Sequence, residues 1–394
     1  MEEILIISNY YPPEKGAAAN RIEQLALKLS DRNYAVSVLC PLANYPKGVL
    51  FKEYQGKFYV EENLQGIAVK RLWIYPSNSS GLLIRILSVL SFSFGLFFYL
   101  LFKRTPKKIV VQSPPLLLAF LSILVLSFKR KKIILNVSDL WPMAALELGV
   151  LKVNSFSHRV SLFFESFIYK NSTVVLGQSD EILEHIHKSF PNKACYLYRN
   201  YPDHQTSFSE VKTEKNNTIK IFYAGLLGVA QGVLEVCEKL DIEQLNIEFH
   251  IFGEGAEKLK IENYLKANPS KKIVFHGMIE RNDLIKKLAL FDVALVPLKT
   301  RIYGSVPSKI FEYSALGIPI FYFGGGEGER IVKENGLGWA VEVEDFDALN
   351  ASIREISLIE NSELTALKKR VLDYSKTNFN LNNQIDNLIQ KGVF

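Results

Sequence analysis

The chain has 394 residues, 48% of them hydrophobic and 22% charged. It is too long for one ordinary core, so we expect two domains, and this composition excludes a disordered protein. The net charge of +6 is concentrated in residues 1–200, which have 24 Lys and Arg against 14 Asp and Glu; residues 201–394 have 23 against 27. Nucleic acid and an anionic membrane are both partners for a basic half, and the apolar runs beside the basic residues favour the membrane over nucleic acid.

The three cysteines, Cys40, Cys195 and Cys237, are far apart in the chain. They form no CxxC or Cys/His spacing, so we expect neither a disulfide framework nor a zinc site. The start, MEEILIISNYYPPE, has acidic residues where a signal peptide has basic ones. We therefore expect a cytoplasmic protein.

The chain begins as a βαβ unit. EILIISNYY reads as a strand, and the next segment, through residue 40, reads as a loop, an amphipathic helix and a second strand. A dinucleotide fingerprint needs G-x-G-x-x-G here, and the loop has only Gly16, which argues against NAD or FAD. Gly16 still allows a ligand close approach to a helix N-terminus, with Arg21 one turn further on. A tight turn, with small residues for packing, is an equally good interpretation of the segment that begins at Gly16.

Two apolar runs follow, at 81–104 and 115–128, and basic clusters border them at 103–108 and 129–132. The first run is long enough to span a bilayer, and the second is too short to do so comfortably. Spanning conflicts with the positive-inside tendency, and a core helix is a plain alternative. We favour monotopic insertion, with apolar helix faces in the headgroup region and the basic residues on anionic lipid.

Asp139 stands just past the strand in KKIILNVSDLWP, where sites of α/β proteins gather, although it could also be a helix cap. Residues 208–218 are polar without periodicity and read as a linker. A second βαβ series begins at 219 with IKIFYAGLLGVAQG.

The stretch from 304 to 328, GSVPSKIFEYSALGIPIFYFGGGEG, contains several of the candidate ligand-binding residues. Pro307 suits the start of a helix, and Gly317 with Pro319 ends it. At that helix start Lys309 can meet an anion and Glu312 can accept hydrogen bonds from a diol, which fits a diphosphate and a sugar. A solvated helix face is the alternative.

PSKIFEYSALGIPI followed by GGGEGERIVKENGLG resembles the C-terminal signature of family 4 glycosyltransferases, in particular the bacterial branch that builds capsule, colanic-acid and O-antigen units. YYPPEKGAAANR and SDLWPMAALELG resemble the first loop and the acceptor-side segment of the same branch. The resemblance implies an α/β fold of two Rossmann-like domains facing across a cleft, called GT-B. It implies an acceptor-binding domain at 1–203, a linker at 204–218, a nucleotide-sugar domain at 219–374, and a helix at 375–394 that crosses back to the first domain.

The resemblance also implies the site. The expected donor-binding residues are Gly16, Gly225, Gly228, Gly277, Met278, Ser308, Lys309 and Glu312. Gly225 and Gly228 would touch the diphosphate, Gly277 and Met278 would receive the base, and Glu312 would hold the ribose. Asp139, Lys309 and Glu327 are the candidate catalytic residues. No metal or other cofactor is implied, and the sequence has no D-x-D motif at a strand end.

Two positions depart from the family pattern. The usual E-x7-E motif has Gly304 where its first carboxylate would stand, so we expect Glu327 to substitute as the sugar contact. Gln231 stands where many relatives have a basic residue, and Lys309 or Arg301 would have to compensate for it.

The function that this resemblance implies is retaining transfer of a sugar from a UDP-sugar, an N-acetylated hexosamine or deoxyhexosamine, to a lipid-linked saccharide at the inner face of the membrane. One alternative is a nucleotide-sugar epimerase of the same fold, which would need its own acid/base pair. Another is a catalytically silent membrane-bound assembly partner, which Gly304 and Gln231 would suit.

Overall fold

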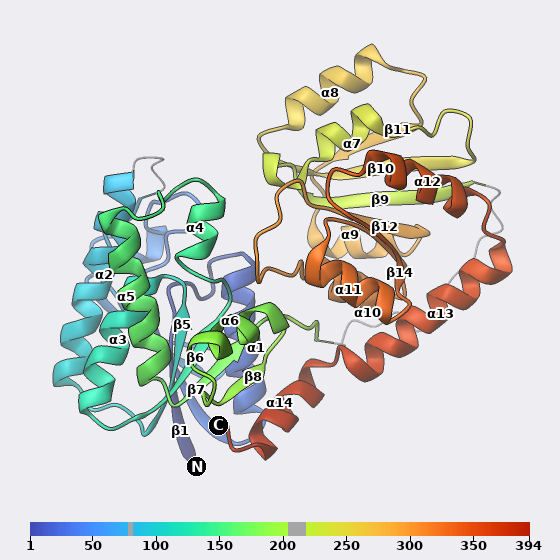
Figure 1. The fold of residues 1–394 in the computed structure, drawn as a ribbon. Helices are drawn as coiled ribbons and strands as arrows, with labels where there is room; N and C mark the ends of the chain where they lie inside the picture. The colour runs from blue at the N-terminus through green and yellow to red at the C-terminus, as the bar shows by residue number, and fades with distance from the viewer. Residues whose placement is uncertain (78–81, 204–217) are drawn as a thin grey trace. The chain divides into compact units, whose positions relative to one another are not determined.

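The computed structural model describes residues 1–77, 82–203 and 218–394, so all but the last residue of the expected linker lie outside the described residues. The chain divides into two compact α/β units (Figure 1). The N-terminal unit holds Met1–Arg199, Tyr303–Ser305 and Asn382–Phe394, and the C-terminal unit holds Asn200–Ile302 and Val306–Leu381. Each unit is a parallel or nearly parallel sheet with helices on both faces, as expected for two Rossmann-like domains.

The N-terminal sheet has the strand order β3-β4-β2-β1-β5-β6-β7-β8. Its strands are β1 (Glu2–Ile7), β2 (Tyr34–Pro41), β3 (Tyr59–Leu64), β4 (Ile67–Leu72), β5 (Lys108–Ser113), β6 (Lys132–Val137), β7 (Val174–Gly177) and β8 (Cys195–Leu197). β3 pairs antiparallel with β4, and the other neighbours pair parallel. The central strands are mostly apolar because both faces of the sheet are covered, and buried polar residues such as Gln112 and Asn136 stand near their carboxyl ends. The order reverses between β1 and β5, so a crevice is expected at the carboxyl ends of these strands.

Helices of the N-terminal unit form two layers (Figure 1). On one face lie α2 (Leu82–Phe102), α3 (Leu116–Phe128), α5 (Phe156–Asn171) and α6 (Asp180–Ser189), and α1 (Ala17–Ser30) covers the other. The short α4 (Met143–Glu147) follows β6, and α14 (Leu381–Gln390) ties to α1 by an ion pair of 2.5 Å between Arg32 and Asp386.

Most of the run at 115–128 is buried or partly buried rather than exposed. As α3 it packs against the sheet between α2 and α5, and its side chains Leu118, Ile123 and Leu126 are fully buried. Its last residue, Phe128, is 83% exposed. Most of this run is therefore core, and the part that its end has in a membrane surface stays a prediction. Among the described residues, no helix combines the length and the apolarity that crossing a membrane requires.

The C-terminal sheet is wholly parallel, with the order β11-β10-β9-β12-β13-β14. Its strands are β9 (Ile219–Leu226), β10 (Ile247–Glu254), β11 (Ile273–Gly277), β12 (Val293–Pro297), β13 (Ile320–Phe323) and β14 (Gly338–Val341). One face carries α7 (Val233–Lys239), α8 (Lys258–Ala267) and α12 (Phe346–Ser357), and the other carries α9 (Arg281–Leu288), α10 (Lys309–Ala315), α11 (Gly326–Glu334) and α13 (Asn361–Asn378). The order reverses between β9 and β12, which places the expected ligand crevice of this unit at the end of β9.

Candidate functional site

Lys309 and Gly225, which are 84 positions apart in the chain, meet at the carboxyl end of β9. The ammonium of Lys309 lies 4.4 Å from the centroid of the Tyr223 ring, and a Cβ atom added to Gly225 would stand 2.0 Å from it. The hydroxyl of Tyr313 on α10 donates to the backbone oxygen of Ala224 at 3.0 Å, which fixes α10 to β9. The absence of a side chain at Gly225 therefore makes room for a cation at the switch point of the sheet.

The surroundings of Lys309 disfavour the charged form of its side chain. Burial lowers the pKa of its ammonium from 10.5 to about 8, and the Glu312 carboxylate only partly opposes this shift. No carboxylate among the described residues forms an ion pair with it. A partly buried cation without a partner gains free energy when an anion arrives, so this position is suited to bind a phosphate.

Ser308 and Glu312 lie in the first turn of α10, beside Lys309. The Ser308 hydroxyl donates to Oε1 of Glu312 at 2.9 Å, which orients the carboxylate and leaves its other oxygen able to accept. Pro307 immediately precedes Ser308, as the sequence predicts for a helix start.

A second cation lies at the carboxyl end of β13. The guanidinium of Arg301 occupies the space beside Gly326, where an added Cβ would be 2.0 Å from Nε. Gly326 opens α11, whose first turn also holds Glu327, and this side chain is only 3% exposed. Arg301 and Glu327 therefore flank the same helix start, at the sheet edge where Lys309 also lies.

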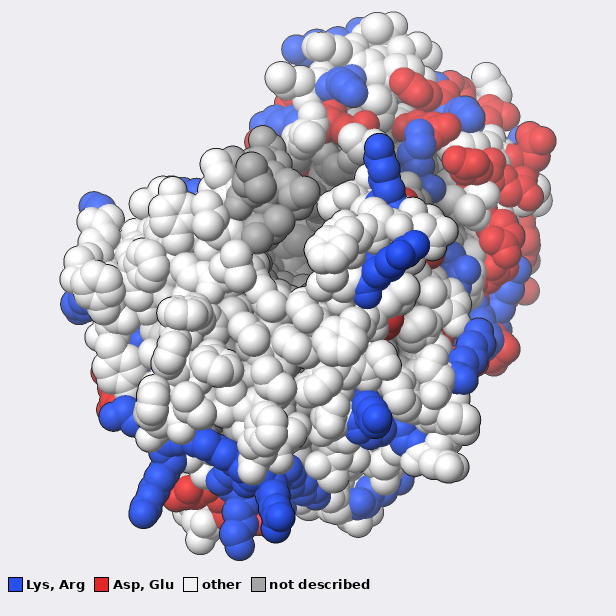
Figure 2. All heavy atoms as spheres, turned by 60° about the vertical axis from the view of Figure 1, so that its left-hand side comes forward, with Lys and Arg blue, Asp and Glu red and all other residues white. Residues whose placement is uncertain are grey.

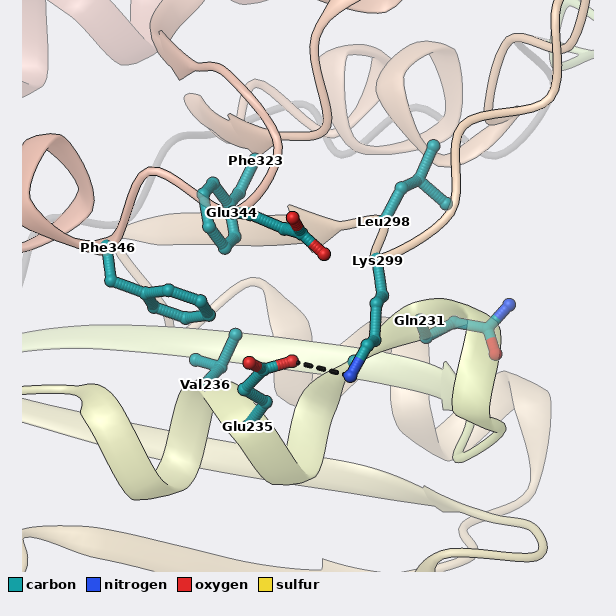
Figure 3. A pocket seen from close by; sticks show the side chains of 9 residues that line it. Gln231, Glu235, Val236, Leu298, Lys299, Phe323, Glu344 and Phe346 are labelled. Atoms are coloured by element: carbon teal, nitrogen blue, oxygen red, sulfur yellow. Dashed lines mark ion pairs between the residues drawn. The ribbon is translucent and has the colours of Figure 1, made fainter.

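Gln231 lines a small cavity of about 10 Å³, which has room for about one water molecule (Figure 3). Its Oε1 atom is buried without a hydrogen-bond partner. Lys299 does not replace the missing basic residue, because its ammonium is paired with Glu235 at 2.8 Å, across the cavity from Gln231 (Figure 3). A Cβ added to Gly228 would be 2.7 Å from the Gln231 amide oxygen, so the Gln231 side chain would have to move.

The expected base-binding turn lies at the end of the edge strand β11. Gly277 has a φ of +71°, and nothing lies within 4 Å of the position of an added Cβ. The next residue, Met278, is 73% exposed. The backbone of this turn is therefore open to a flat ligand.

The N-terminal unit gathers a polar cluster around Arg21, which sequence reasoning placed only as a neighbour of Gly16. The Arg21 guanidinium donates to Asn136 at 2.9 Å and to Gln178 at 3.0 Å, and it lies 4.6 Å from the centroid of the Tyr198 ring. Burial raises the pKa of the nearby Asp139 to about 6, and the charge of Arg21 opposes the shift. Asp139 therefore titrates close to neutral pH, as a group that exchanges protons with a hydroxyl must.

Gly16 lies at the N-cap of α1 with a φ of +154°, and an added Cβ would be 3.6 Å from the Tyr45 ring. One pattern in the sequence does point to this polar cluster. Asn136 stands near the end of the apolar strand β6, and Gln178 directly follows the apolar strand β7.

Gly304 has a structural role that explains the missing carboxylate. Tyr303–Ser305 is part of the N-terminal unit, where the Gly304 amide donates to Glu181 at 2.7 Å and its carbonyl accepts from Ser179 at 2.7 Å. Its φ is +83°, and an added Cβ would lie 3.0 Å from Ile182. Any side chain here would be both strained and crowded.

Comparison with known proteins agrees with this geometry. Residues 205–371 match the family model described as Glycosyl transferases group 1. This match covers most of the C-terminal unit, Asn200–Ile302 with Val306–Leu381. Lys309, Gly225 and Gly326 all lie inside the matched range.

The chain is also similar to three individual proteins. The chain is 27% identical to the probable glycosyltransferase WbjE of Pseudomonas aeruginosa over 77% of this chain and 79% of that protein. It is 24% identical to the putative colanic acid biosynthesis glycosyltransferase WcaL of Salmonella typhimurium over 40% of each chain. The fold resembles Anabaena HepE in complex with UDP and glucose, with a TM-score of 0.67, 13% identity, and coverage of 99% of this chain and 100% of that one. The fold is therefore GT-B.

Proposed function

We propose that this protein is a retaining glycosyltransferase that moves a sugar from a UDP-sugar to a lipid-linked saccharide in the synthesis of a bacterial surface polysaccharide. The match to the group 1 family model and the resemblance to WbjE and WcaL support the transferase class and the polysaccharide setting. The UDP and glucose bound to HepE support a UDP-sugar donor. The donor sugar is an N-acetylated hexosamine or deoxyhexosamine in this proposal.

The observation that carries the proposal is the unpaired ammonium of Lys309 beside Gly225. When a glycosidic bond to UDP breaks, negative charge develops on the departing diphosphate. A cation fixed in place before the reaction stabilises that charge without reorganisation. Arg301 supplies a second cation at the same sheet edge and is the candidate that replaces the basic residue missing at Gln231.

The other residues proposed to contact the donor lie at the same edge of the C-terminal sheet. Glu312 accepts hydrogen bonds from the ribose hydroxyls, and the turn at Gly277 and Met278 receives the base through its backbone. Glu327 holds the transferred sugar. No carboxylate is proposed as a nucleophile: transfer takes place on the front face of the sugar, where the donor phosphate assists removal of the proton from the acceptor hydroxyl.

Asp139, in the N-terminal unit, is proposed to accept a hydrogen bond from the acceptor hydroxyl. Its carboxyl, with a pKa of about 6, is mostly ionised at neutral pH and accepts a hydrogen bond. Arg21, fixed by Asn136 and Gln178, keeps the charge in place.

The N-terminal unit is also proposed to bind a membrane surface from one side, without spanning it. α2 exposes Phe94 at 65% and Phe102 at 76%, and α5 exposes Phe163 at 60%. Figure 2 shows this side of the molecule as a broad face almost free of charged atoms, with Lys and Arg along part of its rim. An apolar face with a basic rim fits the interface of an anionic bilayer.

The basic residues near that face have different roles. Lys129 donates to the Leu100 and Lys103 carbonyls at the end of α2, and Lys131 donates to Thr105, so these two hold the fold. The exposed members of the two basic clusters are the ones proposed to meet lipid headgroups: Lys103, Arg104, Lys107 and Arg130.

Calorimetric titration with UDP tests the donor site. We expect Lys309→Met to weaken binding by about ten- to a hundredfold, because a hydrogen bond to a charged group contributes about 1.5–3 kcal/mol. Glu312→Gln should weaken it by a smaller factor. Lys299→Met is the matched control, since Lys299 is already paired with Glu235, and it should bind as the wild type does. Absence of UDP binding to the wild type, or unchanged binding to Lys309→Met, would refute the proposal.

Co-sedimentation with phosphatidylglycerol vesicles tests the membrane surface. The double variant Phe94→Ser/Phe102→Ser should remain largely in the supernatant, because each aromatic side chain buried in the membrane is worth about 1.5–3 kcal/mol. The control Leu259→Ser removes a side chain that is 70% exposed on α8 and should not change sedimentation. A wild-type protein that never sediments would contradict the model.

A further inference from the structure

The edge strand β11 contains a bulge directly before the turn that is expected to receive the base. Against β10, Phe252 pairs with Gly277, whereas the residue before Phe252 pairs with Phe275, so His276 is the extra residue on β11. A bulge interrupts the ladder and redirects the strand, and bulges are frequent at sheet edges and beside functional sites. The conformation of His276 therefore determines how β11 leads into the turn.

Two contacts hold the His276 side chain, although it is exposed. Its Nε2 atom lies 2.9 Å from Nδ1 of His250 on β10. Its ring also stacks on Phe252, with centroids 4.3 Å apart and planes 8° from parallel. The two imidazole planes differ by 11°, and their centroids are 5.2 Å apart, a separation that fits rings joined end to end by the hydrogen bond. The bulged residue is thus fixed to the neighbouring strand.

The partners of the two histidines define where the hydrogens lie. Oε2 of Glu248 is 3.2 Å from Nε2 of His250, and an ionised carboxylate only accepts, so this nitrogen carries a hydrogen. In the neutral ring Nδ1 of His250 is then an acceptor, and Nε2 of His276 donates to it. We assign both tautomers from these hydrogen-bond roles. The result is a chain of hydrogen bonds from the bulge to a carboxylate.

This chain tolerates one added proton and not two. A first proton can bind Nδ1 of His276, which leaves the donor on Nε2 in place. A second proton must bind Nδ1 of His250, where it would face the hydrogen of His276 and would set two positive charges side by side. The bond between the rings then breaks.

The surroundings favour the uncharged pair. Burial lowers the pKa of both imidazoles from 6.5. Lys220 on β9 adds to this effect at His250, and Glu248 opposes it there. At His276 the charges of His250 and of Lys287 on α9 lower the pKa further. Within the described part of the chain, these are the charged side chains that act on the pair, so the bond is intact at neutral pH.

We propose that Glu248, His250 and His276 are positioning residues for the base of the donor. The bond between the two imidazoles holds the bulge, and the bulge holds the turn at Gly277 and Met278 in the shape that receives the base. Loss of the bond, by substitution or by a second proton, releases the turn. The inference rests on the proposed UDP-sugar site and adds to it the groups that shape its base-binding turn.

Calorimetric titration with UDP and with inorganic pyrophosphate separates the base from the phosphates. We expect His276→Ala to weaken UDP binding about five- to tenfold, which corresponds to about 1–1.4 kcal/mol. His276→Gln keeps an N–H donor for His250 and should restore most of the affinity. Pyrophosphate should bind equally to wild type and both variants, because Lys309 is unchanged. His187→Ala removes an exposed histidine of the N-terminal unit and is the control, with UDP binding as in the wild type.

The pH dependence distinguishes this role from a purely structural one. Between pH 7.5 and 5.0, UDP affinity of the wild type should fall by a larger factor than that of His276→Gln, because a carboxamide can turn its oxygen toward a protonated His250. Titration of UDP itself is common to both proteins, so the ratio of their dissociation constants reports the histidine pair. A constant ratio overturns the proposal, and so does equal weakening of UDP and pyrophosphate binding in His276→Ala.

Hydrogen–deuterium exchange without ligand provides a measurement that does not depend on UDP. At pH 7.5, peptides within 273–280 should exchange faster in His276→Ala than in the wild type or His276→Gln, whereas peptides from β13 should not change. Equal exchange in all three proteins overturns the proposal whatever the binding results. Faster exchange in His276→Ala, with no UDP binding by the wild type, supports the hold of the pair on this turn and refutes the donor assignment instead.

Discussion

At the scale of single residues, Lys309 is the group whose environment most directly suggests a ligand. Its side chain crosses the Tyr223 ring and fills the space left by Gly225. The sequence predicted a cation at the start of this helix, and it also predicted a glycine turn after β9. It could not predict that the two coincide, because their contact depends on how α10 packs on β9.

The lowered pKa of Lys309 makes a pH dependence of UDP binding testable. Since the ammonium of the free protein loses its proton near pH 8, Lys309 should give UDP affinity no slope below about pH 7, where the terminal phosphate of UDP, with a second pKa of about 6, titrates instead. Above pH 8 it should fall by up to about tenfold per pH unit, because the proton must be recovered on binding. Calorimetry from pH 6 to 10 measures this, and Lys309→Arg, which keeps its charge, should remove the slope. An identical slope in Lys309→Arg would assign the titration to another group.

The pKa shift has a separate effect on folding. In the unfolded chain Lys309 keeps its proton up to about pH 10.5, whereas the folded chain loses it near 8. The unfolded state therefore binds more protons between these values, and this residue makes the ligand-free protein more stable as the pH rises through that window. A loss of UDP affinity in this range cannot be attributed to unfolding caused by Lys309.

At the scale of secondary-structure elements, periodicity predicts most strands and helices. It does not predict whether an apolar helix is buried in protein or faces lipid. A helix that is apolar all round is buried either in a core or in lipid, and its sequence alone does not distinguish the two. α3 is in the core because α5 covers its outer side, with Phe164 stacked on Phe120 at a centroid distance of 4.2 Å. That cover comes from residues 156–171, whose mixed composition gave no such signal.

The segment Tyr303–Ser305 is another element whose role depends on tertiary contacts. We expect that Gly304→Glu, which would recreate the usual family carboxylate, does not increase turnover. It should lower the free energy of unfolding by about 1–3 kcal/mol, because φ is +83° and Ile182 is 3.0 Å from the new Cβ. Denaturant unfolding and UDP release measure the two effects.

A matched glycine separates strain from crowding in that experiment. Gly66 has a φ of +85°, and nothing lies within 4 Å of its Cβ position. Gly66→Glu should therefore show the backbone cost alone, and Gly304→Glu should be the less stable variant. Equal stability of the two would mean that contact with Ile182 and Leu140 has no cost.

At the scale of the whole molecule, the last residues of the chain complete the N-terminal unit. Val393 and Ile385 are fully buried, and the Lys132 ammonium donates to the Gly392 carbonyl at 2.5 Å. Periodicity predicts these helices, whereas only the resemblance implies where they lead. The expected crossing helix at 375–394 is, in the structure, the end of α13 followed by α14.

Disrupting this tail should destabilise one unit selectively. Val393→Ser/Phe394→Ser removes two buried apolar side chains, which should cost about 3–6 kcal/mol of the stability of the N-terminal unit. Gln390→Ser/Lys391→Ser changes two exposed neighbours and is the control. Limited proteolysis with mass spectrometry should show new cuts within residues 1–199 only. New cuts within 306–381 as well would show that the two units do not unfold separately.

Gly225 and Gly326 share a property with a practical consequence. Each leaves a gap that the end of a long cationic side chain occupies, Lys309 in one case and Arg301 in the other. A methyl group added at either glycine would eject the cation while the chain keeps its full complement of positive charge. Both glycines also have a positive φ, +155° at Gly225 and +66° at Gly326, so an alanine adds backbone strain. With folding stability measured beside binding, Gly225→Ala and Gly326→Ala separate the location of a charge from its presence, which no substitution of the lysine or the arginine can do.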